Sequence, residues 1–151
     1  MAYVDAYDYQ ATEEDLNNMK YYRERLNARP LTSALRSFDI NDKYESTRLP
    51  GVYEITQDSR VIYIGGNPCL ANIRDCLNAH FSGNDGLPIG RYLSGPARNK
   101  WKSIFVRWLT CAKPNEVAWF LLSDYQMQHG YYPPFNYPAT DKSYQNGAVQ
   151  E

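Results

Sequence analysis

Residues 51–65 have the sequence Gly-Val-Tyr-Glu-Ile-Thr-Gln-Asp-Ser-Arg-Val-Ile-Tyr-Ile-Gly, and this stretch decides the fold. Two β-prone runs, Val52–Thr56 and Arg60–Ile64, flank a polar turn, which predicts a tight hairpin. The hairpin places Tyr53 and Tyr63 side by side on neighbouring strands. A phenol is a poor acid, with a reference pKa of about 10. Two phenols beside a metal ion held by a carboxylate can instead position and deprotonate a water.

The rest of the central region predicts one more strand and a helix. Ser103–Leu109 is rich in β-branched and aromatic residues, and a helix is expected from about Leu70 to Phe81. Between them Ser82–Gly95 is expected to be a long Gly- and Pro-rich loop, a kind of segment that is often functional. The predicted fold class is therefore α/β (α+β), with a small three-stranded antiparallel sheet flanked by helices.

Both ends of the chain carry further signals. A capping box begins at Thr12 and Pro30 stops the helix that follows, so residues 1–48 are expected to be an N-terminal helical extension. Residues 31–40 are ambiguous and could form one short helix. Pro114 and Gly130 delimit the last helix. Residues 49–137 then form the core domain, and residues 138–151 a flexible polar tail.

Several motifs follow one another in a recognisable order. The hairpin carries Gly51-Val52-Tyr53 and Tyr63-Ile64-Gly65, the next helix ends in His80-Phe81, Glu116 opens a long apolar helix, and Pro134-Phe135-Asn136 closes the unit. This order resembles the GIY-YIG nuclease family over somewhat more than half of the chain. Two tripeptides alone are a weak signal, but the whole series in order is fairly specific. The resemblance implies a small α/β domain that hydrolyses DNA phosphodiesters with one divalent metal ion.

The resemblance also implies a role for each matching residue. Tyr53 would activate or orient the water, and Tyr63 would assist it and bind phosphate. His80 would handle protons or contact phosphate. Glu116 would hold the single metal ion, Mg²⁺ or Mn²⁺, and Asn136 would pin the frame by hydrogen bonds. Two glycines would let the backbones approach closely, Gly51 and Gly65. Taken singly, each of these residues also has a purely structural interpretation, such as a buried strand tyrosine, a helix histidine or a turn-capping asparagine.

One family feature is displaced in this chain. The family carries an arginine four residues before the position of His80, and the apolar register of the helix puts Cys76 there. Arg74 is two residues away, which corresponds to roughly 200° around a regular helix. Counted from Tyr63, however, Arg74 lies at nearly the family distance, so it remains a candidate catalytic residue. With Cys76 in the arginine position, either another cation replaces the guanidinium or catalysis is weakened, by on the order of 10²–10³ in rate.

The densest basic cluster follows the expected helix and is a candidate nucleic-acid-binding region: Arg91, Arg98, Lys100 and Lys102. A solvated surface is the competing interpretation. The net charge of −1 and the pI of about 6.1 count against a strong non-specific DNA binder. The chain has three cysteines, and their spacing is not that of a disulfide framework: Cys69, Cys76 and Cys111. Reduced thiols in a cytoplasmic protein are the simplest explanation. A zinc site is not favoured. No stretch is apolar for long enough to cross a membrane.

Two functions from different classes remain open. The first is a metal-dependent DNA endonuclease of the GIY-YIG type. The alternative is a catalytically degenerate domain of the same fold that binds nucleic acid or a protein partner, which Cys76 and the near-neutral charge favour. The extension could also provide a surface for a protein partner or for a homo-oligomer.

Overall fold

A four-stranded antiparallel sheet forms the centre of the computed structural model, which describes residues 11–35, 47–66 and 72–136. The strands are β1 (Thr32–Ser33), β2 (Gly51–Gln57), β3 (Arg60–Gly66) and β4 (Ile104–Thr110). Their spatial order is β1-β4-β2-β3, so β2 and β4 are the inner strands. The predicted hairpin is confirmed, because β2 pairs with β3 in antiparallel register with Tyr53 opposite Gly65.

The hairpin turn explains why the two strands meet in this register. Asp58 and Ser59 both have positive φ angles, 54° and 68°, which is the conformation of the two-residue turn that matches the twist of the flanking strands. A register shift between Ile55 and Thr56 marks a bulge. Tyr63 therefore lies opposite Ile55, and Tyr53 and Tyr63 are diagonal neighbours on one face of the sheet.

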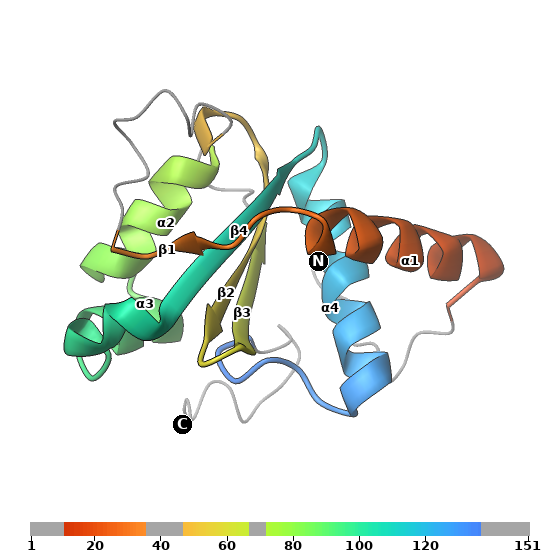
Figure 1. Cartoon of the computed structure of the whole chain (residues 1–151). Helices are drawn as coiled ribbons and strands as arrows, with labels where there is room; N and C mark the ends of the chain where they lie inside the picture. Colours follow the sequence, from red (N-terminus) through yellow and green to blue (C-terminus); the bar gives the residue numbers. More distant parts are fainter. Residues whose placement is uncertain (1–10, 36–46, 67–71, 137–151) are drawn as a thin grey trace.

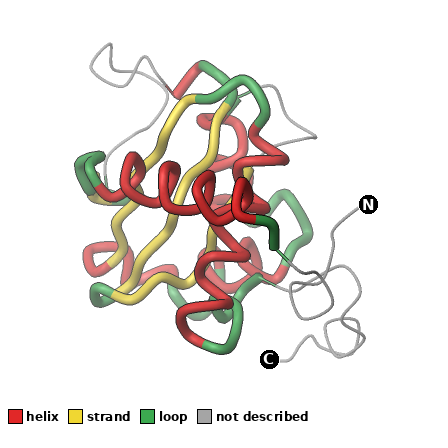
Figure 2. Tube along the Cα trace, turned by 90° about the vertical axis from the view of Figure 1, so that its right-hand side faces the viewer, coloured by secondary structure: helices red, strands yellow, loops and turns green. Residues whose placement is uncertain are grey.

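Helices cover both faces of the sheet (Figure 1). On one side lie α2 (Ile73–Ser82), α3 (Pro88–Ser94) and the 3₁₀ helix η2 (Arg98–Ser103); on the other side lie α1 (Glu13–Asn27) and α4 (Pro114–His129). Two apolar cores result. The first joins Tyr53 and Ile55 to α2 and α3, and the second joins Val52 and Ile64 to α4. Figure 2, seen from the second side, shows the helices of that side in front of the strands.

The described part of the N-terminal extension packs on the domain. The capping box at Thr12 is present, and α1 begins at Glu13, as predicted. Met19 and Leu26 are buried along α1, and Leu26 joins the second core. Arg23 on α1 forms an ion pair of 3.0 Å with Glu54 of β2. Within the described residues, no helix has the length and apolarity that crossing a membrane requires.

The prediction of three strands was wrong by one strand. Thr32 and Ser33, which lie in the segment expected as a short helix, instead form β1, opposite Val106 and Phe105. Pro30 fixes its own φ and favours extended backbone before it, and the edge of β4 provides the hydrogen-bond partners. The strand was missed because a two-residue pairing leaves no periodicity in the sequence. Phe38–Ile40 and the tail at 138–151 lie outside the described residues.

The predicted loop at Ser82–Gly95 was also partly wrong. It contains α3, which begins at Pro88 and buries Ile89 and Leu93. Proline at the first helical position and two apolar residues four apart are the local signals of this helix. In addition, α2 begins at Ile73 after an N-cap at Asn72, rather than near Leu70.

Candidate functional site

Three predicted site residues meet between the sheet and α2. The ring centroid of His80 lies 5.6 Å from that of Tyr53 and 5.1 Å from that of Tyr63, and the two tyrosine rings are 6.3 Å apart. Tyr53 and His80 are almost completely buried, with 2% and 4% of their surface exposed. Tyr63 is only partly buried, so its ring lies nearer to solvent.

A chain of hydrogen bonds runs through this cluster. The Tyr53 hydroxyl lies 2.7 Å from Nε2 of His80, and Nδ1 of His80 contacts a carboxylate oxygen of Asp85. The Asp85 side chain is 11% exposed. Burial alone would raise the pKa of Asp85, but hydrogen bonds from His80 and from the Leu87 amide outweigh it and hold the pKa below its ordinary value. The carboxylate is therefore ionised at neutral pH and accepts hydrogen bonds.

The loop between α2 and α3 holds Asp85 in this position. Gly83 ends α2 in the left-handed conformation and turns the chain back toward α3. The backbone N–H of Leu87 donates to Oδ1 of Asp85 at 2.9 Å. On α3, a Cβ at Gly90 would lie 2.9 Å from Cγ of Asp85, so only glycine leaves room for the carboxylate.

The Tyr53 hydroxyl is held in its protonated form. Burial raises the pKa of Tyr53 well above its ordinary value, and the nearby side chains of Tyr63, Cys76 and Asp85 raise it further. The hydroxyl therefore acts as a hydrogen-bond donor up to high pH. The hydroxyl has two hydrogen-bond partners, Nε2 of His80 at 2.7 Å and the thiol of Cys76.

Cys76 and Arg74 lie on different sides of α2. Cys76 is 5% exposed, packs in the first core and lies close enough to Tyr53 to influence its pKa. Arg74 is half-buried and forms an ion pair of 3.5 Å with its neighbour Asp75. Arg74 lies six positions before His80, which corresponds to about 120° around the helix. The position toward the phenols is therefore occupied by a thiol. Cys69 lies outside the described residues.

Three further motif residues shape the frame around the tyrosines. A Cβ at Gly65 would lie 2.5 Å from the Tyr53 hydroxyl, and a Cβ at Gly51 would lie 2.6 Å from Cδ1 of Ile73. Asn136 bridges the backbone of β3: its Oδ1 accepts from Ile64 N at 2.8 Å, and its Nδ2 donates to Ile64 O at 2.9 Å. Asn136 thus ties the segment after α4 to the strand that carries Tyr63.

Glu116 belongs to α4, whose buried residues are part of the second core rather than of the core that contains Tyr53. It is exposed in the first turn of α4, which packs on the opposite face of the sheet. The backbone of Pro114 and the Cβ of Ala118 lie against Gly66, so the first turn of α4 lies beside the end of β3. The carboxylate at the phenols is that of Asp85, whose two oxygens already accept from Leu87 and contact His80.

Mg²⁺ and Mn²⁺ usually bind carboxylate oxygens and waters, and the carboxylate that contacts His80 is that of Asp85. Among the described residues, no three His, Cys, Asp or Glu side chains gather into a metal-binding group. The divalent ion is therefore a proposal, and no catalytic step is derived through it.

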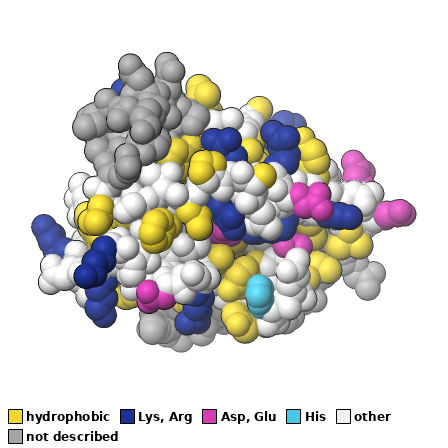
Figure 3. All heavy atoms as spheres, viewed as in Figure 1, with side chains coloured by type: hydrophobic (Ala, Val, Ile, Leu, Met, Phe, Trp, Pro, Cys, Tyr) yellow, Lys and Arg dark blue, Asp and Glu magenta, His cyan; other side chains and the backbone are white. Residues whose placement is uncertain are grey.

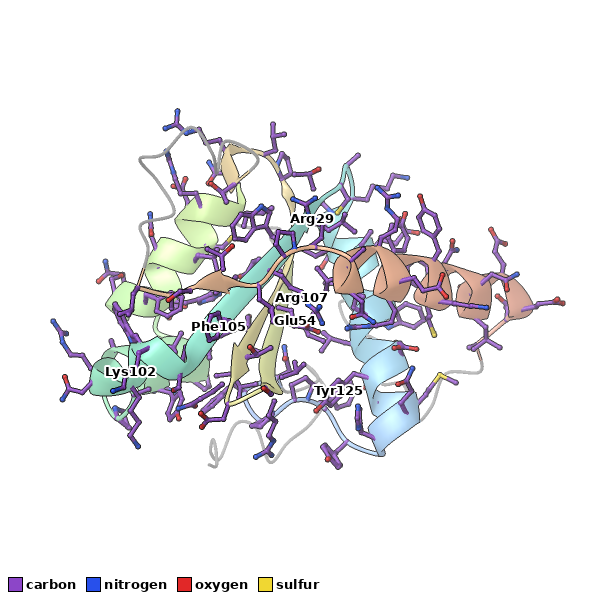
Figure 4. The ribbon with its side chains drawn as sticks, viewed as in Figure 1. Arg29, Glu54, Lys102, Phe105, Arg107 and Tyr125 are labelled. Atoms are coloured by element: carbon purple, nitrogen blue, oxygen red, sulfur yellow. The ribbon has the colours of Figure 1, made fainter. Side chains whose placement is uncertain are left out.

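The predicted cations lie on the same side of the sheet as the phenols. Arg98, Lys100 and Lys102 are exposed on η2, whose Trp101 packs against Phe81 of α2. Figure 3 shows Lys and Arg side chains at the left of the molecule, over α3 and η2, and Figure 4 labels Lys102 there. Arg91 donates a hydrogen bond of 2.6 Å to the carbonyl of Gly86, the residue after Asp85.

Comparison with protein-family models, with curated proteins and with solved structures found no match for this chain. The residue of the cluster that sequence reasoning missed is Asp85. Its signals were a carboxylate five residues after His80 and an Asn-Asp-Gly turn, which favours local hydrogen bonds from an aspartate to backbone amides. The expected loop gave no reason to place this side chain against the helix.

Proposed function

We propose that the chain is a DNA endonuclease of the GIY-YIG type that hydrolyses phosphodiester bonds at the Tyr63 side of the cluster. The observation that carries this proposal is the convergence of Tyr53, Tyr63 and His80, with a hydrogen bond of 2.7 Å between Tyr53 and His80. Buried titratable groups linked in series are typical of sites that move protons. The resemblance of the motifs gives this chemistry its substrate class.

The exposures of the two phenols suggest different roles. Tyr63 is the phenol nearer to solvent, so it is the one that meets the phosphate and the attacking water. Tyr53 is 2% exposed and acts through His80. A positioned group that takes a proton in the transition state contributes typically about 10²–10⁴ in rate. In the proposal the water-positioning role therefore moves from Tyr53 to Tyr63, which keeps its expected contact with phosphate, and Tyr53 lies deeper in the fold.

A divalent ion would polarise the phosphate when bound. Glu116, the residue that the family resemblance assigns to this ion, points to solvent from α4, and Asp85 is engaged by His80 and Leu87. The dependence on Mg²⁺ or Mn²⁺ is thus a separate part of the proposal, and it is tested separately.

Plasmid cleavage tests the proposal directly. Supercoiled DNA incubated with the protein and Mg²⁺ or Mn²⁺ should be nicked or linearised. Tyr63→Phe and His80→Ala should each lower the rate by about 100-fold or more. Tyr21→Phe, at an exposed tyrosine of α1, is the matched control and should cut normally. Intact plasmid with the wild-type protein under both ions would end the nuclease proposal.

The metal assignment has its own variant. Glu116→Ala should abolish cleavage if Glu116 holds the ion, and Glu24→Ala, at an exposed glutamate of α1, controls for the loss of a surface charge. Cleavage that survives Glu116→Ala would remove this residue from the proposal.

The basic cluster of Arg98, Lys100 and Lys102 is the proposed DNA-binding surface. Each phosphate contact that is lost should reduce the slope of log affinity against log salt by about 0.9. We therefore expect the double variant Lys100→Gln and Lys102→Gln to reduce that slope by about 2, as measured by fluorescence anisotropy on a duplex. An unchanged slope would place the contact surface elsewhere.

The second candidate is a degenerate domain that binds nucleic acid or protein without cutting DNA. The observation that favours it is Cys76, which is buried against Tyr53 where the family carries arginine. Without a cation there, the developing negative charge on phosphate lacks one stabilising group.

Cys76→Arg separates the two candidates. Nicking by Cys76→Arg together with an inactive wild type would support the second candidate; robust cutting by the wild type, with no gain in the variant, would exclude it. Because an arginine at this position buries its charge, the variant is expected to be less stable. Cys76→Met adds apolar volume without charge. It therefore separates the loss of stability caused by a larger side chain from the effect of the guanidinium on cleavage.

A further inference from the structure

We propose that Asp85 is a positioning residue that fixes His80 as the tautomer with hydrogen on Nδ1, so that Nε2 accepts the proton of Tyr53. As far as it concerns cleavage, this inference rests on the proposed function. Its structural half, the tautomer, stands on the geometry of the three side chains alone.

The first step is that Asp85 presents one particular oxygen to the imidazole. Its Oδ1 accepts the backbone N–H of Leu87 at 2.9 Å, which leaves Oδ2 in contact with Nδ1 of His80. The absence of a side chain at Gly90 makes room for the carboxylate. Two hydrogen bonds and a glycine of α3 thus fix the orientation of the Asp85 side chain.

The second step follows from which atoms of Asp85, His80 and Tyr53 can donate or accept a hydrogen bond. A carboxylate only accepts hydrogen bonds, so Nδ1 must carry a hydrogen. In the neutral imidazole Nε2 then has a free lone pair, and the Tyr53 hydroxyl, 2.7 Å away, donates to it. The other tautomer would set an Nδ1 lone pair against the carboxylate, in a position where little water competes.

The third step is the proton transfer that this arrangement permits. Burial favours the protonated phenol, so at rest the proton stays on Tyr53. In the transfer step the O–H bond of Tyr53 breaks and an Nε2–H bond forms on His80, which gives a phenolate, an imidazolium and the carboxylate of Asp85. The summed charge of the three groups stays at −1. The carboxylate stabilises the imidazolium, as in hydrolases that pair histidine with aspartate. Tyr63 packs edge-on against His80 at a centroid distance of 5.1 Å. The hydrogen-bonded side chains of Tyr53, His80 and Asp85 therefore lie on the buried side of Tyr63, the more exposed phenol.

Asp85→Asn tests this arrangement with almost no change of volume. The side-chain oxygen of the introduced asparagine is needed to accept the hydrogen bond from the Leu87 amide. Its NH₂ group must therefore point toward Nδ1 of His80. The imidazole should then switch to the tautomer with hydrogen on Nε2, which can no longer accept from Tyr53. The matched control is Asp58→Asn in the hairpin turn, where the φ of 54° suits asparagine.

Nitrogen-15 NMR of the full-length protein reads the tautomer independently of activity. The chain contains two histidines, so His129, exposed on α4, serves as the internal reference. In its neutral form, His80 should carry hydrogen on Nδ1 in the wild type and in Asp58→Asn, and on Nε2 in Asp85→Asn. Plasmid cleavage by Asp85→Asn should fall by about 100-fold or more, while Asp58→Asn cuts like the wild type.

The outcomes separate this inference from the proposed function. A wild-type His80 with hydrogen on Nε2, or the same tautomer before and after Asp85→Asn, overturns the inference whatever the cleavage assay shows. A switched tautomer with full cleavage overturns the positioning role. A wild type that carries hydrogen on Nδ1, switches in Asp85→Asn and yet cuts no DNA ends the nuclease proposal, while the assignment of Asp85 to His80 is supported.

Discussion

Glu54 of β2 accepts a hydrogen bond of 2.8 Å from Nε of Arg107, although its side chain is completely buried. Its second oxygen accepts from Arg23 of α1 at 3.0 Å, and Asn27 accepts from both arginines. Figure 4 shows Glu54 and Arg107 next to each other between the sheet and the helices α1 and α4. The network joins the N-terminal extension to the two inner strands of the sheet.

Glu54→Gln should therefore destabilise the whole protein. The substitution keeps the volume but removes the counter-ion of Arg107 and leaves Arg23 with Asp124 at 3.7 Å as its remaining ion pair. We expect the free energy of unfolding to fall by about 3 kcal/mol, because removing one partner of a buried ion pair leaves an uncompensated charge. Urea denaturation measures the change. Glu24→Gln on the exposed face of α1 should stay within about 0.5 kcal/mol of the wild type. A similarly small effect for Glu54→Gln would mean that water satisfies the arginines.

Asn136→Ala tests the attachment of the C-terminal segment to β3. The amide of Asn136 satisfies both the N–H and the carbonyl of Ile64, and alanine would leave both groups without this partner. A loss of about 1–3 kcal/mol in the free energy of unfolding is expected. Hydrogen exchange at Ile64 N should accelerate, since its acceptor is gone. Asn78→Ala, at an exposed position of α2, is the control, and equal effects of the two substitutions would contradict the bridging role.

The parts of the fold that were predicted from sequence are those with local signals. The hairpin has β-prone runs on both sides of a polar turn, and α1 has its capping box, so both were predictable. In contrast, β1 exists because the edge of β4 accepts Thr32 and Ser33, and that edge is distant in sequence. For α3 the local signals were present, and the surrounding Gly and Pro residues outweighed them.

The candidate site likewise combines features that have local sequence signals with features that depend on how distant segments meet. The bulge between Ile55 and Thr56 sets the register in which Tyr53 and Tyr63 share a face, and the period of α2 turns His80 toward them. Asp85 reaches His80 only because the chain reverses at Gly83, a geometry that no periodicity encodes. For Glu116, a favourable first-turn position is compatible with any direction around the helix, so the sequence could not show that it faces solvent.

Gly65→Ala should disturb the phenol without straining the backbone, because Gly65 is not among the glycines with positive φ. The added methyl group would lie 2.5 Å from the Tyr53 hydroxyl. A loss of about 1–3 kcal/mol is expected for such overpacking. The double variant with Tyr53→Leu removes the clashing ring, so the two losses should be non-additive by 1 kcal/mol or more, on the order seen for residues in contact. Additive losses in a double-mutant cycle would show that the methyl group is accommodated elsewhere.

Tyr53→Phe should change how stability depends on alkaline pH. Burial raises the pKa of Tyr53 well above its ordinary value, whereas the phenol of the unfolded chain ionises near a pH of about 10. Below that pH the folded and unfolded states both hold the proton, and the contribution of Tyr53 to stability is fully present. Above it the unfolded state releases the proton first, so this contribution is lost as the pH rises toward the folded-state pKa.

At pH 8 we expect Tyr53→Phe to be less stable than the wild type by about 1 kcal/mol, the typical net value of one hydrogen bond. This difference should shrink as the pH rises above about 10, because only the wild type loses stability through this phenol. Urea denaturation at several alkaline pH values measures it. Phe81→Leu, in the same core but without a hydroxyl, should differ from the wild type by a constant amount across that range. A constant difference for Tyr53→Phe as well would mean that the Tyr53 phenol ionises in the folded protein as readily as in the unfolded chain.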